Sequence, residues 1–119
     1  MPLNNTLPAP MTYVQLIGTD NAHSASDATW EDWDLSALVP AGTLYVLVGM
    51  GHGNTAATFQ LGVRETGSAL DSRLTFDKAT DAGSRMQLSL IVPVDSARKI
   101  QRYGQTIAQS YFSILGYWI

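Results

Sequence analysis

The sequence contains no cysteine, two histidines and few charged residues. Without cysteine, neither disulfide bonds nor thiolate metal ligands can form. Charged residues make up 14% of the 119 residues, whereas about 25% is typical of soluble domains. So few charges leave a small domain short of groups to cover its surface. We therefore expect part of this surface to face other protein, either further copies of the chain or a partner.

The sequence also lacks long runs of basic residues and long runs of apolar residues. The seven Lys and Arg residues are scattered and the net charge is −3, so we do not expect binding to nucleic acid through its phosphates. No apolar run approaches the roughly 20 residues of a membrane helix. Residues 1–12 lack the basic and apolar segments of a signal peptide. Nucleic acids are therefore not expected partners, and membrane insertion is not expected.

Residues 1–11 hold three of the five prolines. Proline disfavours a helix interior and a central strand, so this segment is expected to be an extended arm ahead of one domain over residues 12–119. Leu3, Leu7 and Met11 give the arm apolar positions that could dock on a neighbouring subunit. A frayed chain end is the alternative.

Apolar residues alternate with polar ones along most of the remaining chain, which predicts about eight short strands and no convincing helix. The expected strands cover 12–18, 44–50, 57–64, 73–77, 86–92, 98–103 and 109–119, with 30–34 as a further extended segment. Residues 95–103 are the best helical alternative, but the segment is short. Strands at this spacing predict an antiparallel β-sandwich or barrel.

The stretch 34–50 joins a corner to the longest β-rich run. Pro40 fixes φ and Gly42 tolerates positive φ, so a tight turn is expected there. In the strand that follows, alternate residues share a face. One face holds Leu44, Val46, Val48 and Met50, and the other holds Tyr45 and Leu47. A strand that is apolar on both faces is expected inside a sheet or under another subunit.

The last expected strand, 109–119, is also apolar on both faces. Strict alternation places Phe112, Ile114 and Trp118 on one face, and Tyr111, Leu115 and Tyr117 on the other. The two doubly apolar strands are expected to pair or to lie in one sheet. We expect either Tyr45 and Leu47, or Tyr111, Leu115 and Tyr117, to contact another chain.

Candidate catalytic and metal sites are sparse. Ser24, His23 and Asp27 could be assembled into a triad, but neighbours in one loop rarely have that geometry. A zinc site needs three or four ligands, and His23 and His52 alone do not supply them. The acidic group Asp27, Glu31, Asp32 and Asp34 could hold Ca²⁺, although a solvated acidic loop is the favoured interpretation. No cofactor is expected.

A ligand or receptor surface is a further hypothesis. Aromatic faces can stack on sugars, although aromatic residues on strands more often serve a core or an interface. The candidate loop residues are His23, Trp30, Trp33, His52 and Asn54, with Tyr103, Tyr111 and Tyr117 as further aromatic positions.

Three segments resemble jelly-roll domains of structural proteins of tailed bacteriophages, including capsid decoration proteins and tail-fibre or spike tips. The first is 33–48, which contains Asp-Leu-Ser and then Val-Pro-Ala-Gly before the central strand. The second, 115–118 (Leu-Gly-Tyr-Trp), is similar to a closing strand, and 62–73 is similar to a middle hairpin. The resemblance covers residues 30–119. It implies a jelly-roll β-sandwich that is non-enzymatic and often trimeric, and it assigns no catalytic residue.

Three functions follow from these observations. The first is a capsid decoration (cement) protein, assembled in the host cytoplasm as a homotrimer, that binds the major capsid protein and stabilises the virion. The second is a receptor- or glycan-binding tip or accessory protein of a phage tail or fibre, which would bind a host surface glycan. The third, a small β-fold enzyme, has the least support because the sequence lacks a catalytic constellation.

Overall fold

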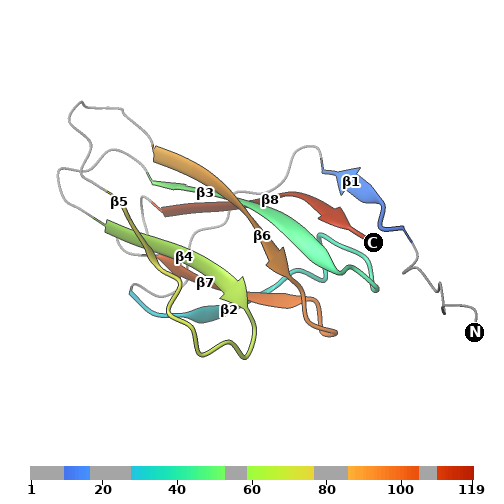
Figure 1. The fold of residues 1–119 in the computed structure, drawn as a ribbon, viewed down its shortest axis with the longest axis horizontal. Helices are drawn as coiled ribbons and strands as arrows, with labels where there is room; N and C mark the ends of the chain where they lie inside the picture. Colours follow the sequence, from blue (N-terminus) through green and yellow to red (C-terminus); the bar gives the residue numbers. More distant parts are fainter. Residues whose placement is uncertain (1–9, 17–27, 53–58, 77–85, 105–109) are drawn as a thin grey trace, which may run out of the picture.

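The computed structural model describes residues 10–16, 28–52, 59–76, 86–104 and 110–119. Within these ranges the chain forms eight strands and no helix, which confirms the all-β prediction (Figure 1). The strands are β1 (Tyr13–Gln15), β2 (Glu31–Asp34), β3 (Tyr45–His52), β4 (Phe59–Glu65), β5 (Leu74–Phe76), β6 (Met86–Pro93), β7 (Lys99–Gly104) and β8 (Ser110–Trp118).

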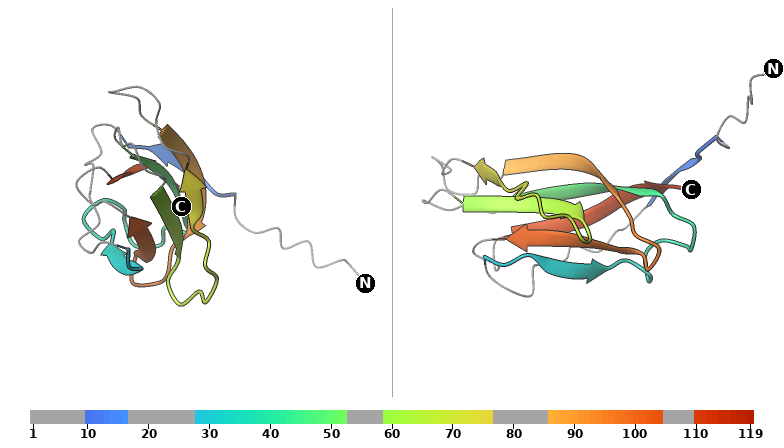
Figure 2. Two further views of the ribbon diagram at one scale, coloured as in Figure 1. Left: turned by 90° about the vertical axis from the view of Figure 1, so that its left-hand side faces the viewer. Right: turned by 60° about the horizontal axis from the view of Figure 1, so that its bottom comes forward.

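The strands form two four-stranded antiparallel sheets that pack face to face (Figure 2). Sheet A has the order β1-β8-β3-β6, and sheet B has the order β2-β7-β4-β5. The pairing is nested, because β1 pairs with β8, β2 with β7, β3 with β6 and β4 with β5. Eight strands paired in this way and folded over into two sheets form a jelly roll. The predicted β-sandwich is therefore confirmed, and so is the pairing of the two doubly apolar strands, β3 and β8.

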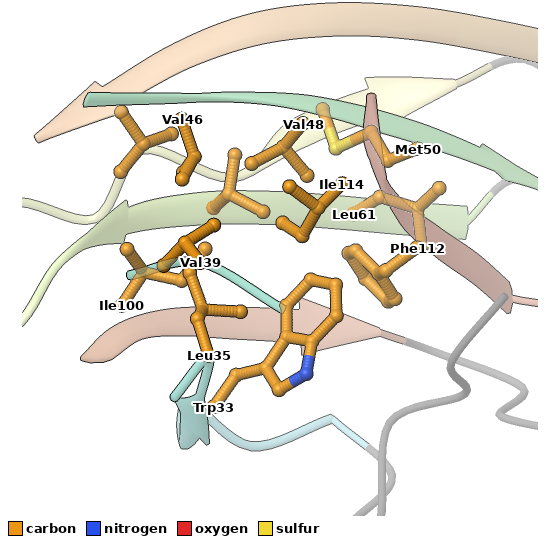
Figure 3. Close-up of a cluster of buried hydrophobic side chains, with 12 residues drawn as sticks. Trp33, Leu35, Val39, Val46, Val48, Met50, Leu61, Ile100, Phe112 and Ile114 are labelled. Atoms are coloured by element: carbon orange, nitrogen blue, oxygen red, sulfur yellow. The ribbon is translucent and has the colours of Figure 1, made fainter. Parts of the chain in front are cut away.

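The core fills the space between the two sheets (Figure 3). Val46, Val48 and Met50 point into it from β3. The alternation in the sequence predicts that these three residues share a face, and the structure shows that this face is the inner one. The other fully or almost fully buried apolar residues are Trp33, Leu35, Val39, Leu61, Val63, Val92, Ile100, Phe112 and Ile114. Trp33 of sheet B meets Phe112 of sheet A at 6.3 Å between ring centroids.

A tight corner precedes β3, where the sequence predicts one. Gly42 has a φ of 90°, which L-residues rarely adopt. The Thr43 N–H donates to the Pro40 carbonyl at 3.3 Å, and the Thr43 hydroxyl donates to the same oxygen at 2.8 Å. These bonds let Thr43 be buried without an unsatisfied hydroxyl. The corner fixes the point at which the chain enters the centre of sheet A.

The expected faces of Tyr117 and Trp118 are wrong, because β8 contains a bulge. Ile114 pairs with Val48 and Gly116 pairs with Leu47, so Leu115 is an extra residue on β8. The extra residue reverses the alternation that follows it. Tyr117 therefore packs against the core, and Trp118 lies on the outer side of sheet A.

One other expectation differs from the structure at a strand end, and the helical alternative for 95–103 gives way to the expected strand. Leu44 precedes β3 and is 48% exposed, so it does not share the core with Val46. The segment considered as a helix begins with a turn, in which the Arg98 N–H donates to the Asp95 carbonyl at 2.9 Å, and continues as β7.

Candidate interaction surfaces

The two sheets differ sharply in charge. The strands of sheet A contain no Asp, Glu, Lys or Arg, although they include the longest strands that the structure describes. The charged residues of the strands all belong to sheet B, namely Glu31, Asp32, Asp34, Arg64, Glu65, Lys99 and Arg102. An antiparallel sheet that faces water normally alternates apolar and polar or charged residues. Sheet A departs from this rule on its outer side.

The outer side of sheet A carries the uncharged polar residues Gln15, Ser89 and Ser113 among a larger set of apolar and aromatic side chains. We call this larger set the sheet A face. Its members are Tyr13, Tyr45, Leu47, Ile91, Pro93, Tyr111, Leu115 and Trp118. The strand register places Tyr13, Trp118, Tyr45 and Pro93 in one row across all four strands. Ile91 is 60% exposed, Tyr13 is 42% exposed and Tyr45 is 36% exposed. Large apolar side chains that lie together and exposed on one side of a protein are typical of contact surfaces.

Glycines on the same side let the larger side chains lie flat. A Cβ on Gly116 would clash with the ring of Tyr13, which also packs against Trp118 with 4.8 Å between ring centroids. A Cβ on Gly49 would lie 3.1 Å from the Leu115 side chain. At these two glycines the side chains of Tyr13 and Leu115 therefore lie directly over the backbone of sheet A.

The outer side of sheet B is covered by side chains from its strands and from the residues just before β2 and β5. Trp30 crosses Gly62, where a Cβ would lie 2.8 Å from the indole. Arg64 stacks over the Trp30 ring at 4.1 Å, and Trp30 meets Tyr103 at 5.5 Å between centroids. Arg73 lies 4.8 Å from the Tyr103 ring and donates to its hydroxyl at 3.0 Å. Cations stacked on aromatic rings stabilise this layer within the chain.

A chain of polar contacts continues across the same side. The Gln101 amide donates to Asp32 at 2.9 Å, and the Arg64 Nε donates to the Gln101 oxygen at 2.8 Å. Three neighbouring strands, β2, β7 and β4, are thereby linked through their side chains. The outer side of sheet B is thus charged and internally hydrogen-bonded, unlike the sheet A face.

One charged pair lies between the sheets. Arg102 is 8% exposed, and its Nε donates to Glu31 at 2.8 Å. The guanidinium lies 4.7 Å from the Trp33 ring. Its Nη1 atom is buried without a hydrogen-bond partner among the described residues. The buried positive charge of Arg102 is therefore balanced by the Glu31 carboxylate.

The residues expected to contact another chain are found in different places. Tyr45, Leu47, Tyr111 and Leu115 lie on the sheet A face, whereas Tyr117 points inward. Met11 is 51% exposed ahead of β1. Leu3 and Leu7 lie outside the described residues. That these side chains bind another chain remains a prediction.

The candidate ligand residues do not form one platform in the described part of the chain. Trp33 is buried in the core, which removes it from any surface platform, and Trp30 is half-buried beneath Arg64. Tyr103 is 5% exposed on sheet B, far in the fold from Tyr111 on sheet A. His52 ends β3, whereas His23 and Asn54 lie outside the described residues.

The acidic group considered for Ca²⁺ is divided among separate partners. Glu31 binds Arg102, Asp32 accepts from Gln101, and Asp34 accepts from the Ser36 N–H at 2.9 Å. The Ser36 backbone hydrogen bond holds the pKa of Asp34 below its ordinary value. Asp27 lies outside the described residues. Among those that are described, no three His, Asp or Glu side chains cluster as metal ligands.

The sequence interpretation missed the contribution of β6 to the sheet A face. Strict alternation along 86–92 places Ile91 on the same side as the polar residues Gln87 and Ser89, yet Ile91 is 60% exposed on the sheet A face. A single isoleucine among polar residues was the available signal. The strand register places Ile91 beside Leu47, which the sequence of one strand cannot show.

The sequence matches no protein-family model and no curated protein. Similar solved structures include two of the coat protein of Tobacco streak virus, one of them described as a dimer. They share 13% and 16% sequence identity with this chain, each with a TM-score of 0.42. The alignments cover 96% of this chain and 87% and 85% of the coat protein chains. Similarity at this level assigns no function, so the functional inference depends on the two faces of the sandwich. The described residues form no helix long and apolar enough to span a bilayer.

Proposed function

We propose that this chain is a non-enzymatic virion structural protein of the capsid decoration type, which associates with further copies of itself through the sheet A face. The single observation that supports this proposal best is the absence of Asp, Glu, Lys and Arg from all four strands of sheet A. The jelly-roll topology is compatible with it, because viral capsid domains use this fold, although lectins and cupins do as well.

The partner proposed for the sheet A face is a second copy, because the face carries no charged residue and is therefore compatible with a copy of itself. Two such faces can meet without burying an unpaired charge, which would be costly. Burial would contribute about 25 cal/mol per Å² of apolar area, before the costs of ordering and association are subtracted. A homotrimer on the surface of a shell is the expected assembly.

The first experiment tests self-association with one charge on the face. Ile91→Lys places an ammonium group beside Leu47, whereas Ser96→Lys adds the same charge at an exposed turn and serves as the control. Sedimentation should show an oligomer for the wild type and the control and a monomer for Ile91→Lys. The same three proteins are then added to shells of the virus that encodes the chain. A wild type that stays monomeric and fails to bind these shells would overturn the proposal.

A further inference from the structure

An apolar groove runs along the free edge of sheet A. It lies between β6 and the end of β4 with the segment that follows, and its volume is about 220 Å³. Its polar lining consists of Arg64, Glu65, Ser68 and Ser72. Its apolar lining consists of Val63, Leu70, Leu90, Ile91, Val92 and Pro93. Leu70 is 74% exposed and Ile91 is 60% exposed, so both project apolar groups that no described residue covers.

The edge of β6 can also form hydrogen bonds. In the described sheet β6 pairs with β3 alone, and it is the last strand of the order β1-β8-β3-β6. An edge strand of this length presents backbone N–H and C=O groups that another extended segment can pair with. Within the described ranges no strand pairs with this edge through backbone hydrogen bonds.

We propose that residues 1–9 of a second copy occupy this groove, and this inference rests on the self-association proposed above. The segment Met-Pro-Leu-Asn-Asn-Thr-Leu-Pro-Ala is uncharged, which matches a groove lined mainly by apolar residues. Residues 3–7 contain no proline and can therefore donate backbone hydrogen bonds to a strand edge. In an extended chain Leu3 and Leu7 share one face, separated by about 13 Å, while Asn4 lies on the other.

The attachment point favours a second copy over the same copy. Tyr13 and Pro93 belong to the same row across sheet A but lie on its opposite edges. Residues 10–12 lead into β1 at the end of the sandwich where Thr12 pairs with Ile119 (Figure 1). Nine extended residues reach about 30 Å. To reach its own groove, the segment would have to reverse direction beside Pro8 and Pro10, which favour extended backbone.

The groove is continuous with the sheet A face. Ile91 and Pro93 contribute to both surfaces. A neighbour that approaches the face would therefore bring its own N-terminal segment within reach of β6. The two contacts are separable, because Leu70 lines the groove without belonging to the sheet A face.

Cysteine cross-linking of the full chain tests this inference, since the native sequence has no cysteine. One protein carries Leu7→Cys and the other carries Leu70→Cys, and the two are mixed under mild oxidation. A disulfide-linked dimer is expected, at a yield at least about tenfold above that of Leu7→Cys with Ser96→Cys, because burial of the arm leucines favours the docked state. Adding Leu3→Asp to the Leu7→Cys chain should lower the yield by about tenfold, whereas Asn4→Asp should leave it unchanged.

Each other outcome overturns the inference. A yield equal to the Ser96→Cys control means that the arm does not dock in the groove. If the chain carrying both Leu7→Cys and Leu70→Cys closes on itself as a monomer, the arm occupies its own groove. If the wild type forms oligomers but no specific cross-link appears, docking of the arm in the groove is wrong, whereas self-association through the sheet A face still stands.

Discussion

At the scale of single residues, Arg102 is the most unusual choice in the core. A guanidinium between two sheets, in contact with Trp33 and bound to Glu31, replaces the apolar residue that packing alone would favour. Buried ion pairs often contribute little net stability, because desolvation offsets the attraction between the charges. Removing one partner is different, since the other charge then stays buried and unpaired.

Glu31→Ala is therefore expected to lower the free energy of unfolding by about 3 kcal/mol or more. The double variant Glu31→Leu with Arg102→Met should recover most of this loss, because it removes both charges and keeps apolar volume. Urea denaturation of the wild type, the single variant and the double variant provides the measurement. A single variant as stable as wild type would show that Arg102 finds another partner or reaches water.

At the scale of elements, regular alternation was enough to locate the strands. The sequence pattern predicted which residues of β3 share a face, such as Val46 and Val48, because side chains along a strand alternate between its two faces. It did not predict which of the two apolar faces meets the core. It could not predict the bulge at Leu115, since one extra residue looks the same as continued alternation. Gly116 was a weak signal, because glycine inside a strand often marks a bulge.

The pairing of strands was less accessible to sequence reasoning. The pairing of β3 with β8 was expected because both are apolar on two faces, and the resemblance of 62–73 to a hairpin agrees with the pairing of β4 and β5. Other partners are far apart in sequence, as in the pairing of Asp32 with Gln101, and no local pattern encodes such contacts. For the same reason the groove beside β6 was not foreseen, since its walls come from both sheets.

The corner between β2 and β3 begins with Asp34, whose carboxylate accepts from the Ser36 N–H. This hydrogen bond lowers the pKa of Asp34 in the folded state. A lowered pKa gives stability that is present above the unfolded pKa of about 3.9 and is lost as pH falls through the folded value. Asp34→Ala should therefore lower the melting temperature at neutral pH and have little effect near pH 2.

Thermal unfolding of the wild type and Asp34→Ala across this range checks the prediction. Ser96→Ala, at another exposed turn, is the control and should follow the wild-type curve at every pH. An equal loss at pH 7 and near pH 2 would mean that the side chain stabilises the corner independently of its charge.

At the scale of the whole molecule, charge is confined to one of the two layers. Sheet B holds every charged strand residue that the structure describes, and sheet A holds none. This division explains how a chain with 14% charged residues can keep one side compatible with water. The outer side of sheet A, which has no charged strand residue, is the side that we propose for protein contact.

Self-association through an uncharged face should respond weakly to salt. The dissociation constant is expected to change less than about threefold between roughly 0.05 and 1 M NaCl, because screening acts only on charges. Ammonium sulfate should tighten association, since excluded salts favour burial of apolar surface. Sedimentation equilibrium across both series is the measurement. A steep weakening in NaCl would instead place ion pairs, and therefore sheet B, in the interface.

The pairing of Thr12 with Ile119 has a practical consequence for any fusion protein. Their backbones exchange hydrogen bonds of 2.8 and 3.0 Å, so the described fold is entered and left at one pole (Figure 1). A peptide or reporter attached after Ile119 would project from the pole at which the N-terminal segment departs. On a shell coated with this chain, every peptide fused after Ile119 would then have the same orientation relative to the domain to which it is attached. This end of the sandwich is therefore a suitable site for displaying fused peptides.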